Sequence, residues 1–139
     1  MTKKTIFFDL FGVLLSWGVT GFKPLISISL LKKLSKNHSL WIISNTSNRQ
    51  IGILKKRFDF FQNFTNIITS ETTGYHKPDI AIFEYALQHA KALPNQSIFI
   101  DDSIKNIQSA VSLGIVSHHY VEDKKLIQFL EDQCLLYLN

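Results

Sequence analysis

The chain has 139 residues, the size of one ordinary domain, so we expect a single unit over residues 1–139 with one core and one site. Hydrophobic residues make up 45% and charged residues 19%, a balance that argues against an intrinsically disordered chain. The net charge of +4 is modest, and the basic residues are spread without interleaved aromatic residues. This pattern argues against nucleic acid as a partner and is compatible with an anionic ligand such as a phosphate.

The first residues and the lone cysteine indicate the cellular compartment in which we expect the protein. Lys3 and Lys4 precede a mostly apolar stretch, but Asp9 interrupts it, and the apolar runs on either side are too short for a membrane span or a signal peptide. Cys134 has no partner for an intrachain disulfide, so we expect a reducing compartment, the cytoplasm, and a packing role for this thiol in a terminal helix.

Short apolar runs alternate with stretches of helical spacing along the whole chain. In chain order they predict strand 5–9, helix 26–36, strand 40–44, helix 48–58, strand 66–69, helix 79–91, strand 97–101, helix 103–113, strand 115–120 and helix 123–138. Such alternation implies parallel strands joined by right-handed crossovers. We therefore predict an α/β fold with a five-stranded parallel sheet covered by helices on both faces.

Polar residues stand at or just after the carboxyl ends of these strands, where ligands of open parallel sheets bind. They are Asp9, Ser44, Asn45, Asp101 and Asp102, together with His76 and Lys77 in the loop after the third strand. Crowded carboxylates raise one another's pKa unless a cation neutralises them. Magnesium prefers oxygen ligands and is typically held by one or two carboxylates plus a substrate phosphate. This edge is therefore predicted to bind magnesium and a phosphate.

Each of these residues also has a structural interpretation. Asp102 and Ser103 are suited to capping the helix that follows, and Ser44 with Asn45 forms an equally plausible loop and cap. Asp9 fits a structural role least well, because an acidic side chain inside an apolar strand is costly to bury without a cation or donors.

Four segments carry motifs in order along nearly the whole chain. They are residues 6–13 with Asp9, Gly12 and Val13; residues 40–45 with Ser44; Lys77 with Pro78, Asp79 and Phe83; and Asp101 with Asp102, Ser103 and Asn106. These motifs resemble those of the haloacid dehalogenase superfamily of hydrolases. Each motif alone is weakly specific, but four in the right order and spacing are strongly specific.

The resemblance implies a Rossmann-like three-layer α/β/α sandwich and a magnesium-dependent phosphohydrolase. Asp9 would be the nucleophile that forms an aspartyl-phosphate, and Ser44, Asn45 and Lys77 would bind the phosphoryl group, with Lys77 also stabilising its charge. Magnesium would be held by Asp9, the backbone carbonyl of Phe11 and Asp102, with Asp101 assisting directly or through water. The substrate would be a phosphorylated small molecule or a macromolecular phosphate.

Phe11 departs from the motif that phosphatases of this superfamily usually carry, which has a second Asp two residues after the nucleophile. That Asp acts as general acid and base, a contribution of about 10² to 10⁴ in rate. We therefore expect slow hydrolysis of ordinary esters and a preference for good leaving groups, such as acyl phosphates or sugar 1-phosphates. Two alternatives remain open, a phospho-accepting or binding module without turnover, and carbon–halogen hydrolysis, since dehalogenases of the superfamily carry an aromatic residue here.

The second departure is the missing cap domain. Only residues 16–24 are available for it, enough for a flap with Trp17 and Phe22 as lids, so the site is open to large substrates or to closure by a second copy of the chain. His76 is a candidate replacement for the missing acid. For the pair His118 and His119 we expect a role other than metal binding, because the pair lacks the spacing of a zinc motif.

Overall fold

The computed structural model describes residues 2–18 and 21–136. Its main sheet contains five parallel strands in the order β5-β4-β1-β6-β7. These strands are β1 (Thr5–Phe8), β4 (Ser39–Ser44), β5 (Asn66–Thr69), β6 (Ser97–Asp101) and β7 (Val116–His119). The chain thus starts at the centre of the sheet, builds one half, and crosses back to build the other. The predicted five-stranded parallel sheet is confirmed, and its order reverses beside β1.

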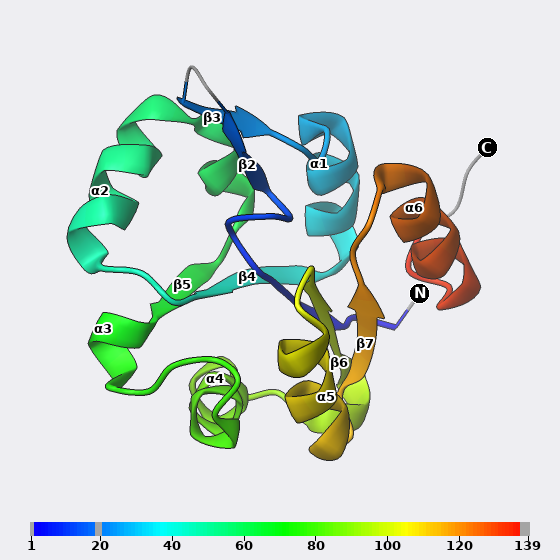
Figure 1. Ribbon diagram of the computed structural model, residues 1–139. Coiled ribbons are helices and arrows are strands. Elements are labelled where there is room, and N and C mark those ends of the chain that lie inside the picture. Colours follow the sequence, from blue (N-terminus) through cyan, green and yellow to red (C-terminus); the bar gives the residue numbers. More distant parts are fainter. Residues whose placement is uncertain (1, 19–20, 137–139) are drawn as a thin grey trace.

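Helices cover both faces of the sheet, as predicted (Figure 1). One face carries α1 (Ile28–Asn37), α2 (Asn48–Arg57) and α6 (Asp123–Asp132), and the other carries α4 (Ile80–Ala90) and α5 (Ile104–Ser112). Alternation along β1 shows the two cores directly, because Ile6 and Phe8 pack on the first side and Phe7 on the second. The fold is therefore a Rossmann-like three-layer α/β/α sandwich.

Serine residues fix where three of these helices begin. Ser27, Ser47 and Ser103 each accept a hydrogen bond at Oγ from a backbone N–H in the first turn of α1, α2 and α5, at 3.2, 3.1 and 3.4 Å. Such caps stop a helix from extending toward its amino end, which is why α1 begins after Ser27 rather than at residue 26. The described residues also contain the short helix α3 (Ser70–Thr73) and the 3₁₀ helices η1 (Asp59–Asn63) and η2 (Pro94–Gln96).

The last helix is shorter than predicted. It ends at Asp132 instead of residue 138, and residues 137–139 lie outside the described part of the chain. Cys134 has a left-handed φ of 58° and is exposed, so the prediction that it packs in a terminal helix is wrong. The chain turns here because Leu135 and Leu136 fold back into the core, and Leu135 N–H bonds to Leu130 O at 2.9 Å. Nowhere between residues 2 and 136, leaving aside 19–20, is a helix long and apolar enough to cross a membrane.

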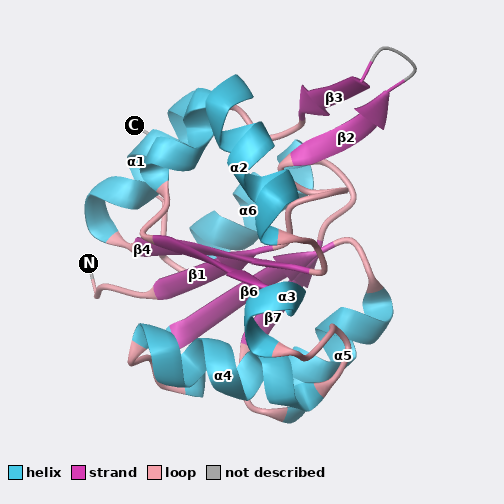
Figure 2. Cartoon of the chain, turned by 90° about the vertical axis from the view of Figure 1, so that its left-hand side faces the viewer, coloured by secondary structure: helices cyan, strands magenta, loops and turns pink. Residues whose placement is uncertain are grey.

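Between β1 and α1 the described residues form a turn and a small antiparallel hairpin, β2 (Leu15–Gly18) and β3 (Gly21–Pro24). Figure 2 shows this hairpin projecting from the body of the molecule. Trp17 lies directly opposite Phe22 in its register. The structure thus places the expected flap at residues 16–18 and 21–24, and residues 19–20 lie outside the described part of the chain.

Candidate active site

The residues predicted from the strand ends meet at one edge of the sheet. Asp9 directly follows β1, Ser44 ends β4, Asp101 ends β6, and Lys77 comes from the loop before α4. Together they line a pocket of about 190 Å³ whose lining residues are Asp9, Phe11, Ser44, Asn45, Lys77, Asp101, Asp102 and Asn106. The structure thus brings together the residues predicted to act as nucleophile, to bind the phosphoryl group and to hold the metal, but not His76, the candidate for the missing acid.

Lys77 lies between two carboxylates that come from different strands. Its Nζ is 2.7 Å from Asp9 Oδ1 and 2.9 Å from Asp101 Oδ2, and its side chain is only 2% exposed. The backbone N–H of Leu10 donates to the same Asp9 oxygen at 2.8 Å. Two donors therefore hold Oδ1 of Asp9, and the carboxylate is fixed in orientation at the mouth of the pocket.

Asn45 holds the Lys77 loop in place. Its side-chain amide donates to Lys77 O at 2.9 Å and accepts from Lys77 N–H at 2.8 Å, so both ends of the amide are engaged. That Asn45 binds the substrate stays a prediction, since Asn45 lines the pocket; the contacts that its side chain makes in this structure hold the backbone of Lys77. Asn45 thus positions the ammonium of Lys77 across 32 residues of sequence.

Asp101 is fully buried and accepts three hydrogen bonds. Besides Lys77, Ser103 N–H donates to its Oδ1 at 2.9 Å and Asn106 Nδ2 donates to its Oδ2 at 3.0 Å. Burial by itself raises the pKa of Asp101, but Lys77 and these donors outweigh burial and lower it. Asn106 belongs to the fourth motif, yet the sequence assigned it no role; its place one helical turn after the cap residue Ser103 was the available signal.

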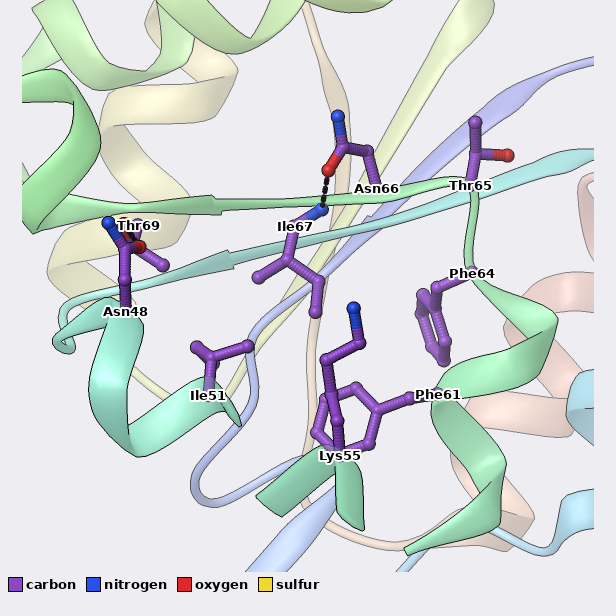
Figure 3. A pocket seen from close by; sticks show the side chains of 9 residues that line it. All are labelled: Asn48, Ile51, Lys55, Phe61, Phe64, Thr65, Asn66, Ile67 and Thr69. Atoms are coloured by element: carbon purple, nitrogen blue, oxygen red, sulfur yellow. Dashed lines mark hydrogen bonds between the residues drawn. The ribbon is translucent and has the colours of Figure 1, made fainter. Parts of the chain in front are cut away.

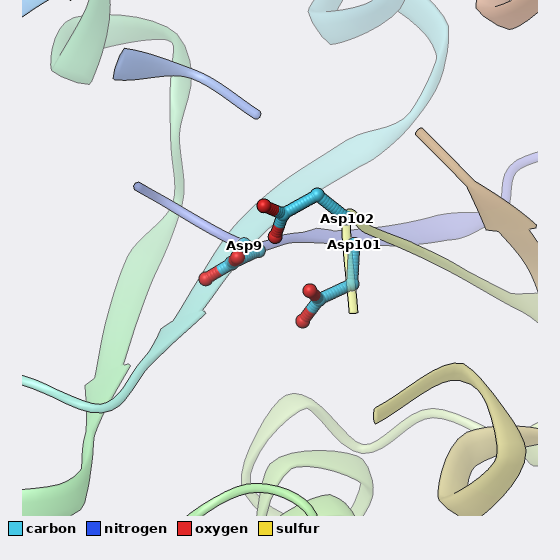
Figure 4. A group of neighbouring side chains, drawn as sticks. All are labelled: Asp9, Asp101 and Asp102. Atoms are coloured by element: carbon cyan, nitrogen blue, oxygen red, sulfur yellow. The ribbon is translucent and has the colours of Figure 1, made fainter. Parts of the chain in front are cut away.

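Asp9, Asp101 and Asp102 converge, with ligand oxygens that all lie within 4.8 Å of one another (Figure 4). Burial is the main cause that raises the pKa of Asp9, to about 7, and the pKa of Asp102, and repulsion from Asp101 adds to both; the ammonium of Lys77 offsets only part of the rise at Asp9. Gly12 passes close by with a φ of +92°, and a Cβ there would lie 2.2 Å from Asp102 Oδ2. Hard oxygen donors with an excess of negative charge, in a cradle that excludes a side chain, fit a divalent cation such as magnesium.

The remaining candidates lie around this pocket. The ring of Phe11 stacks on Trp17, with centroids 5.0 Å apart, so its aromatic face is directed toward the hairpin. His76 is exposed and outside the residues that line the pocket, which leaves it poorly placed to replace the missing acid. His119 Nε2 is 2.9 Å from Asp102 O, and His118 stacks on Phe129 of α6.

Two larger pockets contain no comparable chemistry. The first, about 210 Å³, runs between β5 and α2, and Figure 3 shows Lys55 and Phe61 projecting into it. Its described lining residues include no carboxylate. The second, about 390 Å³, is mostly apolar and lies between residues 24–28 and η1. Neither shares a lining residue with the Asp9 pocket.

Known proteins resemble this chain in sequence and in fold. The chain is 34% identical to drimenol cyclase of Aspergillus calidoustus over 61% of its length, and 32% identical to phosphoglycolate phosphatase of Pseudomonas putida over 53%. It spans only 16% and 27% of the lengths of these two relatives. A HAD family enzyme of Bacteroides thetaiotaomicron, solved in complex with magnesium and inorganic phosphate, shares the fold with a TM-score of 0.76 at 19% identity, covering 89% of this chain and 98% of that one.

A family model extends the likeness over most of the chain. The model described as haloacid dehalogenase-like hydrolase matches residues 26–119, which include β4, β5, β6, the Lys77 loop and the Asp101–Asp102 pair. These segments supply the pocket's ammonium, its hydroxyl and two of its three carboxylates. The chain belongs to the haloacid dehalogenase-like hydrolases.

Proposed function

We propose that the protein is a magnesium-dependent phosphohydrolase that works through a phosphorylated Asp9. The observation that carries the proposal is the carboxylate of Asp9, held 2.7 Å from the buried ammonium of Lys77 and close to the carboxylate of Asp102. The similarity to a phosphoglycolate phosphatase supports a phosphate ester as substrate and lends no support to a carbon–halogen bond.

The chain's residues divide the work as follows. Ser44 Oγ and Lys77 Nζ bind oxygens of the phosphoryl group, and Asn45 keeps Lys77 in place. Oδ1 of Asp9 is held by two donors, which leaves Oδ2 to attack phosphorus. The bond from phosphorus to the leaving oxygen breaks as the bond to Oδ2 forms. The leaving oxygen departs as an anion and takes its proton from solvent. Water then attacks phosphorus, the bond from phosphorus to Asp9 Oδ2 breaks, Asp9 regains its carboxylate, and inorganic phosphate leaves after the attacking water has lost a proton to solvent.

Asp9, Asp102 and the backbone carbonyl of Phe11 would hold the magnesium ion. When bound, the ion offsets negative charge on the phosphoryl oxygens and on the carboxylates. Asp101 is occupied by Lys77, Ser103 N–H and Asn106, so it supports the site through hydrogen bonds. Its buried charge keeps the ammonium of Lys77 paired and aimed at the pocket.

Phe11 limits which substrates react well. A phenyl ring donates no proton, so the leaving oxygen departs as an anion, which is fast only when that anion is a weak base. The best substrates are therefore acyl phosphates, sugar 1-phosphates or aryl phosphates of acidic phenols, and alkyl phosphates are poor ones. The open pocket leaves room for the remainder of such a molecule.

The test is magnesium-dependent release of inorganic phosphate from acetyl phosphate, glucose 1-phosphate and 4-nitrophenyl phosphate. Wild type, Asp9→Asn and the matched control Asp132→Asn, at an exposed position on α6, are compared in excess magnesium and in EDTA. We expect turnover in wild type and the control only, only with magnesium, and a phosphorylated protein trapped by acid quench. Folded, magnesium-binding protein that turns over none of the three would instead favour a phospho-accepting or binding module.

A further inference from the structure

We propose that Phe11, Trp17 and Phe22 form an aromatic platform on which the apolar group of a phosphate ester stacks while its phosphoryl group occupies the Asp9 pocket. This inference rests on the proposed phosphohydrolase function and names its substrate class: phosphate esters with a flat, apolar leaving group. The three rings are called the aromatic platform below.

The platform is a closely packed unit. The ring centroids are 5.0 Å apart for Phe11 and Trp17, 5.2 Å for Phe11 and Phe22, and 4.7 Å for Trp17 and Phe22. These separations lie in the range of favourable aromatic contacts. Phe11 and Phe22 also pack against the main hydrophobic core, so the platform is anchored from below.

Its upper member is left open to solvent. Trp17 is 72% exposed, the highest value among the exposed large hydrophobic side chains of the described residues. An indole ring in water is available for a contact that the fold itself does not make. The two rings beneath it are partly buried, which gives a rigid base and a free face.

Phe11 joins the platform to the phosphoryl site. Among the described residues that line the Asp9 pocket, Phe11 is the one whose side chain is apolar, and all the others carry polar or charged side chains. An apolar group attached to a phosphoryl group in this pocket therefore meets favourable surface only in the direction of Phe11, which leads to Trp17 and Phe22. Because the Asp9 pocket and the aromatic platform meet at Phe11, we assign the platform to the leaving group of the substrate.

Aromatic pairs also stabilise hairpins, which is the competing explanation. A two-stranded hairpin is marginal by itself, and directly opposed aromatic residues such as Trp17 and Phe22 strengthen it. A purely structural role predicts that loss of Trp17 affects every substrate to the same extent. A platform predicts a loss that grows with the apolar area of the leaving group.

The experiment compares acetyl phosphate, phenyl phosphate and 2-naphthyl phosphate on wild type, Trp17→Ala, Trp17→Phe and Leu93→Ala. Leu93 is a matched control because it is 59% exposed and lies outside the residues that line the pocket. We measure KM for each ester, and in the Asp9→Asn background we titrate the two aryl esters in magnesium by calorimetry. The preference is the ratio of KM for phenyl phosphate to KM for 2-naphthyl phosphate. This ratio should fall about tenfold in Trp17→Ala, equivalent to about 1.4 kcal/mol, and should stay unchanged in Trp17→Phe and Leu93→Ala.

The outcomes separate the two proposals. An unchanged preference in Trp17→Ala, or an equal fall in Leu93→Ala, overturns the platform even when acetyl phosphate is hydrolysed normally. Absence of turnover in wild type overturns the phosphohydrolase, whereas the titrations on Asp9→Asn still report whether Trp17 recognises the aryl group. Self-association that Trp17→Ala abolishes, without any effect on the esters, would assign the platform to a second copy of the chain and overturn the inference.

Discussion

Replacing Lys77 by methionine isolates the charge that holds the site together. Methionine keeps much of the length and apolar volume of the side chain but removes the ammonium. The change leaves Asp9 and Asp101 facing the same buried space without a counter-charge, and Asp101 has no exposed surface. Removing one partner from a buried ion pair is strongly destabilising for this reason.

The magnitude follows from the contacts that remain. Nζ makes two short hydrogen bonds to carboxylate oxygens, at 2.7 Å to Asp9 and 2.9 Å to Asp101, and a bond to an ionised group contributes about 1.5–3 kcal/mol. Burial raises the pKa of Asp9 to about 7, so Asp9 is only partly ionised near neutral pH and its bond contributes less than that of Asp101. Asp101 keeps the donors of Ser103 and Asn106, and Asp9 keeps Leu10 N–H, so the loss lies toward the lower end of the sum. We expect the free energy of unfolding to fall by about 3 kcal/mol near neutral pH.

The assay is urea unfolding in EDTA, because a bound divalent cation would replace part of the lost charge. Lys32→Met on the exposed face of α1 is the control, and it should change the free energy of unfolding by less than about 0.5 kcal/mol. Lys77 lowers the pKa of Asp101, so the contribution of this pair is full above the ordinary value of 3.8 and is lost as the pH falls below it, whereas the contribution of the pair with Asp9 is already lost as the pH falls through about 7. The difference in the free energy of unfolding between wild type and Lys77→Met should therefore become smaller in acid. A loss below about 1 kcal/mol, or a difference independent of pH, would refute this electrostatic account.

Three further predictions concern other parts of the chain. Gly12→Ala should destabilise the fold by about 1–2 kcal/mol and weaken magnesium binding measured by calorimetry, whereas the matched Gly52→Ala, in open space on α2, should not. Burial lowers the pKa of His38, whose Nδ1 accepts from Lys4 N–H, so the urea midpoint should fall as the pH drops below 6.5; an equally steep fall in His38→Gln would contradict this. Phe11→Asp should raise turnover of alkyl phosphates relative to acetyl phosphate by about 10² or more, and Phe11→Asn, whose amide has no acidic proton to transfer, should not.

Local sequence pattern was sufficient to predict the strands of the main sheet and most of the site. The apolar runs located all five strands of the main sheet, because residues such as Ile6, Phe7 and Phe8 are buried on both faces and leave no alternation to misread. The rule that ligands bind beyond the carboxyl ends of parallel strands then selected Asp9, Ser44 and Asp101. These residues follow their strands directly in sequence, so their position depends only on the strands themselves.

Prediction from local sequence pattern failed where the structure depends on a contact with a residue far away in the sequence. The last helix continues as a periodic pattern past Asp132, but the chain turns because Leu135 finds space in the core. His76 stands beside Lys77 in the sequence, yet only Lys77 is buried at the site, because Asn45 holds that residue's backbone. The sequence of the loop has no periodic pattern from which one could predict whether His76 or Lys77 points into the site.

The sequence by itself determined the fold class, the family motifs and the set of residues at the active edge. Only the tertiary structure decided that one ammonium lies between Asp9 and Asp101, 68 and 24 residues away from it, and that Phe11 joins the pocket to Trp17. The physical reason is range. Backbone propensity and the alternation of apolar residues depend on neighbours within a few residues, so the local sequence shows them. The pairing of buried charges and rings depends on how separate segments pack in space.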